Sequence, residues 1–150
     1  MKLAAALTER AELQTRLQQL AVRLNNNALV QEGEKPAEAP TELLEELEAG
    51  YARLEELIAR INRTNSEARV GSDTLSDLLA RRDCFKGKLG VLRAFAAQAS
   101  ATASRRTVGE IRIMSTVNVR ELQKQIDGLS RRLRELDDLI QEQNWTVELL

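Results

Sequence analysis

The sequence contains no histidine and only one cysteine, Cys84, among its 150 residues. Without histidine the chain cannot build a histidine acid–base site, a Ser-His-Asp triad or the Glu-x-x-His di-metal motif of carboxylate helical bundles. It also contains no GxxxxGK[ST] or GxGxxG phosphate-binding loop. A lone cysteine cannot form an intrachain disulfide, which favours a reducing compartment such as the cytoplasm. These absences favour a non-catalytic protein with no cofactor and no bound metal.

Aromatic residues, charge of one sign and long apolar runs are also scarce. Aromatics make up 3% of the chain, against 43% apolar and 30% charged residues, a balance typical of leucine-rich amphipathic helices. The net charge is −1, so no global field attracts nucleic acid. No segment reaches the roughly 20 apolar residues of a membrane span. The apolar run at 3–7 is too short for a secretory signal. We expect neither nucleic-acid binding nor integral membrane association.

Apolar residues recur at alternating spacings of three and four in four segments, which predicts helices over about 3–24, 42–62, 75–99 and 119–142. A polar stretch ending in Pro40 separates the first two helices, and Thr41 is the expected N-cap of the second. Thr74 with Asp77, and Asn118 with Glu121, have capping-box spacing at the starts of the other two. Near 105–117 the helical period disappears, which predicts a short β-strand or an extended loop.

The end of the second helix recurs in the fourth. Leu54 to Ile58, followed by Asn62 and Thr64, corresponds to Leu136 to Ile140, followed by Asn144 and Thr146, at an offset of 82 residues. The first and third helices also align, at an offset of 72 residues. We therefore predict an all-α fold, an antiparallel four-helix bundle or coiled coil of two repeated helical hairpins, in one domain spanning residues 1–150.

This topology places the ends of the second and fourth helices at one pole, where polar side chains gather. One hypothesis is a site for a small polar or anionic ligand, and possibly an enzyme, formed by Asn62, Arg63, Thr64, Asn65, Arg69, Asn144 and Trp145. The competing interpretation is structural: these residues cap helix ends, and Trp145 anchors the tail by packing beside Asn62 to Asn65.

Two arginines and the cysteine occupy notable positions on the predicted helices. Arg10 and Arg82 fall on apolar stripes, so we expect them to be buried and either paired with a neighbouring helix or lining a polar pocket. Cys84 lies off the stripe of its helix, and we interpret it as an incidental thiol. Metal ligation is not predicted, because the stripe positions of the second and fourth helices are apolar.

Self-association is the functional expectation that the helical pattern supports best. Leu43 and Leu57 widen the apolar stripe of the second helix beyond what one antiparallel neighbour covers. The protein is therefore predicted to form a homo-oligomer or to bind a protein partner.

Four short runs, in this order, resemble a family of short uncharacterised bacterial proteins across nearly the whole chain. The runs are Val30 to Glu34, Ile61 to Ser66, Ser115 to Val117 and Asn144 to Thr146. Some members carry the label septicolysin, which implies a pore-forming toxin. That activity is not carried over, because nothing in the sequence resembles the large β-rich body of cholesterol-dependent cytolysins. The resemblance implies a bacterial source and supplies no catalytic residues.

Overall fold

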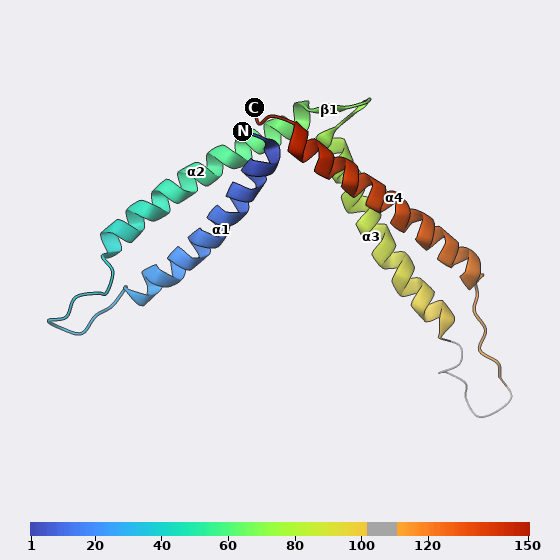
Figure 1. Ribbon diagram of the computed structural model, residues 1–150. Coiled ribbons are helices and arrows are strands. Elements are labelled where there is room, and N and C mark those ends of the chain that lie inside the picture. Colours follow the sequence, from blue (N-terminus) through green and yellow to red (C-terminus); the bar gives the residue numbers. More distant parts are fainter. Residues whose placement is uncertain (102–110) are drawn as a thin grey trace. The chain divides into compact units, whose positions relative to one another are not determined.

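The computed structural model describes residues 1–101 and 111–150, and its regular structure is almost entirely helical (Figure 1). Each predicted helix is present, and each continues beyond its predicted C-terminal end. The elements are α1 (Leu3–Asn26), α2 (Pro40–Glu67), β1 (Arg69–Val70), β2 (Asp73–Thr74), α3 (Leu75–Ser100) and α4 (Val119–Thr146). The all-α fold class is confirmed.

Two of the three predicted helix caps are confirmed. Thr74 accepts a hydrogen bond from the backbone N–H of Asp77, and the Asp77 carboxylate accepts from the backbone N–H of Thr74, which completes a capping box. The side chain of Asn118 accepts from the backbone N–H of Glu121 at 3.2 Å. The prediction for Thr41 is wrong, because α2 begins earlier. Its N-cap is Ala39 and Pro40 occupies the first turn, where proline's fixed φ suits a helix and its missing N–H has no effect.

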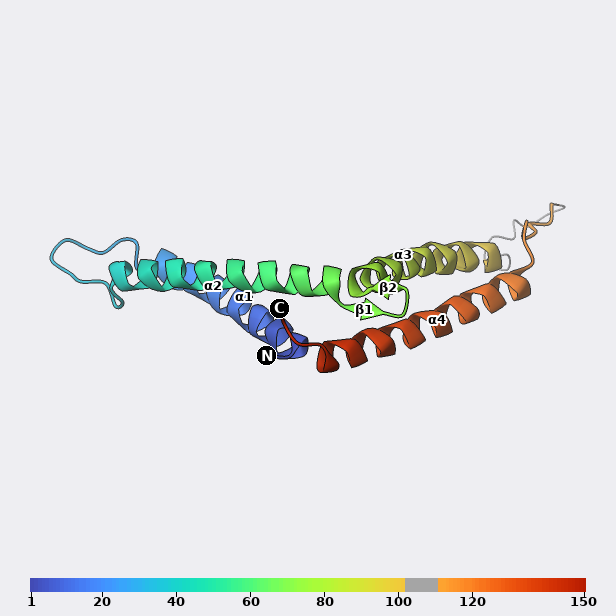
Figure 2. The same ribbon diagram turned by 90° about the horizontal axis from the view of Figure 1, so that it is seen from above.

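The two short strands form a tight hairpin between α2 and α3 (Figure 2). Gly71 begins the turn with φ +64°, a conformation that glycine adopts without steric penalty. In the predicted extended segment, residues 111–117 contain no strand, which fits the loop alternative. The rest of that segment, 105–110, lies outside the described residues.

The chain divides into two compact units, each built on one pair of helices. The α1/α2 unit comprises Met1–Arg69 together with Gln143–Leu150, and the α3/α4 unit comprises Val70–Glu142. The last turn of α4 and the C-terminal tail therefore belong with α1 and α2. This division agrees with the two hairpins that the sequence repeat predicted.

In the α1/α2 unit the two helices run antiparallel around a leucine core. Leu17, Leu20, Leu43 and Leu54 form one buried cluster. The helices approach closely at Gly50, where an added Cβ would lie 2.7 Å from Cδ2 of Leu17. Glycine is thus the residue that lets α2 lie against α1 at this level.

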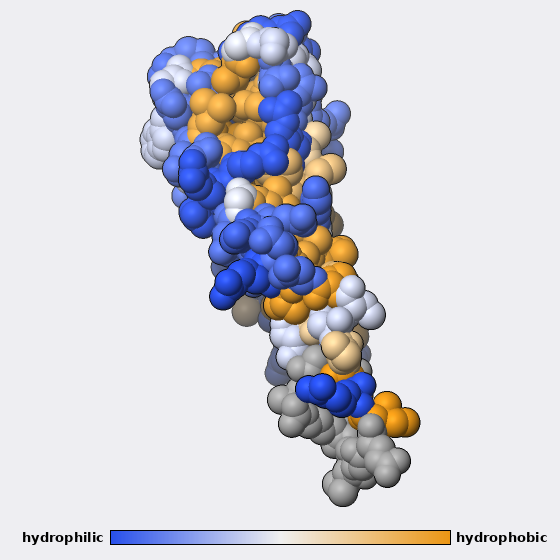
Figure 3. All heavy atoms as spheres, turned by 90° about the vertical axis from the view of Figure 1, so that its right-hand side faces the viewer, coloured by the Kyte–Doolittle hydropathy of each residue, from blue (hydrophilic) through white to orange (hydrophobic). Residues whose placement is uncertain are grey.

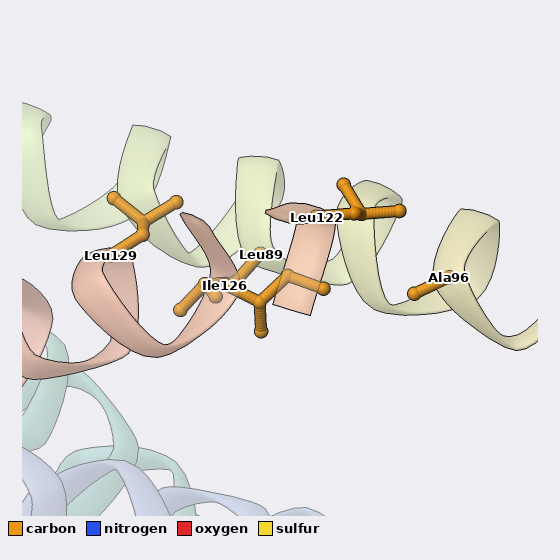
Figure 4. Packing of buried hydrophobic residues seen from close by; sticks show 5 residues of the cluster. All are labelled: Leu89, Ala96, Leu122, Ile126 and Leu129. Atoms are coloured by element: carbon orange, nitrogen blue, oxygen red, sulfur yellow. The ribbon is translucent and has the colours of Figure 1, made fainter. Parts of the chain in front are cut away.

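The α3/α4 unit has its own apolar cluster. Figure 4 shows Leu89 and Ala96 of α3 with Leu122, Ile126 and Leu129 of α4, all of them buried. Two polar contacts also join the helices. The Arg132 guanidinium lies 5.0 Å from the centroid of the Phe85 ring, and Arg93 donates a hydrogen bond to Ser130 at 3.0 Å.

Candidate functional site

The chain ends meet in a small arrangement that we call the terminal clasp, formed by Met1 to Leu3 and Val147 to Leu150; Figure 1 marks the two ends beside each other. The backbone N–H of Leu3 donates to the carbonyl of Val147 at 3.0 Å. The N–H of Leu149 donates to the carbonyl of Met1 at 2.8 Å. The side chain of Leu149 is buried. Main-chain pairing and one leucine therefore hold the tail in place.

The clasp also reaches the last turns of α2 through Thr64, which is 1% exposed. The Thr64 hydroxyl donates to the carbonyl of Arg60 at 2.8 Å and accepts from the N–H of Leu150 at 3.0 Å. Arg60 Nε in turn donates to the carbonyl oxygen of Leu150 at 2.7 Å. The Thr64 hydroxyl thus donates one hydrogen bond and accepts another within the chain, and the accepted bond holds the tail against α2.

Charges reinforce the terminal clasp. Lys2 Nζ lies 2.6 Å from a Glu148 carboxylate oxygen and donates to the carbonyl of Thr146 at 2.9 Å. The amino group of Met1 lies 3.2 Å from the other Glu148 oxygen. The hydrogen bond from Lys2, followed by the one from Met1, holds the pKa of the Glu148 carboxyl below its usual range.

The structure separates the predicted ligand residues into three groups by their exposure. Thr64 is buried, Asn65 and Asn144 are half-buried, and Asn62, Arg63, Arg69 and Trp145 are exposed. The expectation that Trp145 anchors the tail is wrong, since its side chain is 69% exposed. Leu150 and Leu149 make the anchoring contacts instead, because the chain turns back onto α1 and α2 only after Trp145. The tail that follows α4 does contact the last turns of α2, and this contact is made through Thr64.

The two stripe arginines are half-buried rather than buried. Arg82 pairs with Asp83 of its own helix at 3.4 Å, and not with a neighbouring helix. Cys84 is a free, exposed thiol. Within residues 1–101 and 111–150, no group of three or more cysteine or acidic side chains is arranged to hold a metal ion. In the same described parts, no helix has the length and apolar character of a membrane span.

The two sides of α2 differ in what they offer to other molecules. Ion pairs to α1 line one side, where Glu46 meets Arg16 at 3.4 Å and Arg53 meets Glu9 at 2.7 Å. On the other side lies the α2 stripe, defined as Leu44, Tyr51 and Ile58, which are 54%, 56% and 38% exposed. Because residues two positions apart differ by about 200° around a helix, the stripe points away from the ion pairs.

α2 therefore has an exposed apolar surface, but the sequence predicted the wrong residues for it. Leu43 and Leu57, which the sequence predicted to provide apolar surface for another subunit, are 3% and 0% exposed. The helix packs with them inward and leaves the α2 stripe uncovered. An apolar stripe that is wider than the contact with one neighbouring helix can turn either of its edges toward that helix. Only the packing of the two helices decides which edge is buried.

A second uncovered surface, the α3 outer face, was not predicted from the sequence. It comprises Ala80, Cys84, Gly87, Val91, Ala94, Phe95 and Gln98, all exposed and none charged. Except for Phe95, these positions alternate by four and three, the spacing of a heptad seam. Val91, two positions from the buried Leu89, points away from α4 and is 70% exposed. The heptad spacing of these residues is present in the sequence, but most of them are too small to be recognised as an apolar stripe.

These features define the chain as an all-α protein of two helical hairpins. It belongs to a family described as a family of unknown function (DUF6847), which matches residues 10–149. It is similar to a functionally unknown conserved protein from Corynebacterium diphtheriae, whose crystal structure shares 40% sequence identity and a TM-score of 0.91. That likeness covers 100% of this chain and 99% of the other. No curated protein matches the chain.

Proposed function

We propose that this chain is a non-catalytic protein of the bacterial cytoplasm that acts by self-association, or by binding a protein partner, through helix faces that its own core leaves uncovered. The observation that carries the proposal is the α3 outer face, an uncharged heptad seam centred on Val91, which is 70% exposed. Burying apolar surface stabilises a complex by about 25 cal/mol per Å² removed from water. Contiguous apolar surface on a folded chain is typical of interaction sites.

The distribution of apolar surface supports this proposal. Figure 3 shows one face of the molecule, with apolar surface in patches between hydrophilic ones, down to the residues beside the grey segment. Near that segment, Phe95, Ile113 and Met114 line a groove of about 230 Å³. The side chains of Ile113 and Met114 are 42% and 76% exposed. Phe95, Ile113 and Met114 thus expose apolar surface beside the C-terminal end of α3.

Light scattering after size-exclusion chromatography tests self-association. We expect the wild-type chain, loaded at tens of micromolar, to have a mass above that of a monomer. Val91→Lys should reduce this mass, because a lysine ammonium resists burial in an apolar contact. Val22→Lys is the matched control, since Val22 is also an exposed helical valine, at 58% exposure, but lies on α1. A wild-type monomer would contradict self-association.

The second candidate function, binding of a small polar or anionic ligand near the ends of α2 and α4, rests on a different observation. Arg63 and Trp145 are both exposed and belong to the same compact unit, so a cation and an aromatic ring are open to a ligand. Trp145 is the only tryptophan, so its fluorescence reports on this site alone. We expect titration with nucleotides and phosphosugars to change that fluorescence. An unchanged signal with every compound would argue against the second candidate.

A further inference from the structure

The α2 stripe is apolar along its centre and acidic along its outer border. Glu48 and Glu55 alternate with Leu44, Tyr51 and Ile58 at spacings of four and three, so all five side chains lie on one side of the helix. Both glutamates are exposed. The helix as a whole, Pro40–Glu67, carries seven acidic and three basic residues. Any surface that covers this stripe must therefore accept large apolar side chains and supply positive charge.

The α3 outer face has the opposite character. Its residues are small or apolar, with the exposed Arg81, Lys88 and Asp77 along one border and the exposed Asp83 on the other. Arg81 makes an ion pair with Asp73 at 3.1 Å, in which its side chain is 44% exposed. The helix as a whole, Leu75–Ser100, carries five basic and two acidic residues. This face therefore offers shallow apolar space beside positive charge.

We propose that the α2 stripe of one copy of this chain packs on the α3 outer face of a second copy. This inference rests on the proposed self-association and names the surfaces that carry it. Glu48 and Glu55 are seven residues apart, and so are Arg81 and Lys88, so one register can bring both pairs of opposite charges together. An added Cβ at Gly87 would meet nothing within 4 Å. The open space at Gly87 leaves room for the ring of Tyr51.

A contact between two different faces is heterologous, and this has a consequence for assembly. Each copy offers one α2 stripe and one α3 outer face, so each copy can contact partners through both. An α3-to-α3 contact would instead place Lys88 near Lys88 of the partner subunit. An α2-to-α2 contact would bring the glutamates of both copies together. Charge complementarity therefore favours the heterologous pairing over either like-with-like alternative.

Reciprocal charge reversal tests this pairing. Variant A carries Glu48→Lys and Glu55→Lys, and variant B carries Arg81→Glu and Lys88→Glu. Each variant alone sets like charges against each other, and we expect its association to weaken by roughly tenfold or more in analytical ultracentrifugation. An equimolar mixture should regain association, because the lysines of variant A then meet the glutamates of variant B. A chain with all four substitutions should also associate again.

The matched control for variant A is Glu45→Lys with Glu67→Lys, which changes the net charge equally on exposed α2 positions away from the stripe. Circular dichroism of each variant verifies that its helices are retained. If the wild-type chain associates but variant A, variant B or their mixture behaves otherwise than described, the α2-to-α3 pairing is wrong while self-association stands. If the wild-type chain is a monomer, self-association and the α2-to-α3 pairing are both wrong, and only the protein-partner alternative of the proposed function is left.

Discussion

The two hairpins join their helices by different means. In the α1/α2 unit, ion pairs cross between the helices and the terminal clasp adds main-chain hydrogen bonds. In the α3/α4 unit the helices meet through the Leu89 cluster, the Arg132 contact with Phe85 and the Arg93 hydrogen bond to Ser130. Among the described residues of this second unit, each ion pair joins two residues of one helix or, for Arg81 and Asp73, joins α3 to β2.

The difference shows that helices with the same heptad pattern can carry charged side chains beside the core in one hairpin and an uncharged exposed face in the other. Charged side chains beside the α1/α2 core restrict register, because a slip along the helix would separate Glu9 from Arg53 and Glu46 from Arg16. The α3/α4 unit has no such crossing ion pair among its described residues, and its α3 helix carries an uncharged face on the side away from α4. The first unit thus has ion pairs between its helices, and the second has an uncharged exposed face on α3.

The largest effects are expected from core truncations that compare the two units directly. Leu57→Ala in the first unit and Leu89→Ala in the second should each lower the free energy of unfolding by about 3 kcal/mol, because both side chains are almost fully buried. Urea titration measures the loss. Hydrogen exchange should then increase chiefly in the unit that carries the substitution. Equal increases in both units would show that their cores are not separate.

Helical glycines give a smaller effect of opposite sign in the two units. Gly50→Ala should destabilise by about 1 kcal/mol, because the new methyl group would overlap Leu17 by more than the helix propensity of alanine repays. Gly128→Ala should stabilise by up to about 1 kcal/mol, because an added Cβ there meets nothing within 4 Å. Thermal unfolding of the two variants measures both changes. Stabilisation by both would mean that α1 and α2 are less closely packed than described.

Acid should weaken the α1/α2 unit in particular. Hydrogen bonds from Arg53, Arg23 and Lys2 hold the pKa values of Glu9, Glu38 and Glu148 below the ordinary value of 4.5. A pKa lowered by folding gives stability that is present above the unfolded-state value and is lost as pH falls through the folded-state value. Hydrogen exchange from pH 6 to pH 3 should therefore show α1 and α2 opening first. Glu9→Gln should reduce this dependence on pH, and equal acid sensitivity of both units would contradict the comparison.

The smallest effect is expected at the end of α4. Trp145→Ala should change the free energy of unfolding by no more than about 0.5 kcal/mol, because the ring is 69% exposed. Native fluorescence should resemble that of a solvated indole and shift little on unfolding. Leu149→Ala is the control from the same tail, and it should cost more than 2 kcal/mol because Leu149 is buried. A blue-shifted native emission would show that Trp145 is enclosed.

Much of the helical architecture could be predicted because it depends on local chemistry. The heptad spacing located all four helices, and Thr74 with Asp77 marked the start of α3. Helix ends were less predictable. Asn62 and Asn144 looked like terminators, yet α2 and α4 continue past them, since asparagine disfavours a helix only weakly when neighbouring contacts hold its last turns. The anchoring role predicted for Trp145 was wrong, because its side chain stays exposed.

The sequence by itself determined where the helices lie and which residues can share a helix face, because a period of 3.6 residues is a property of each helix alone. Only the tertiary structure decided which apolar face is covered. It placed Leu43 and Leu57 inside and left Leu44 and Tyr51 exposed, since that choice depends on how α1 lies against α2. It also decided how the tail is held. Main-chain hydrogen bonds such as Leu3 to Val147 can form with almost any side chain, so no residue pattern announces them.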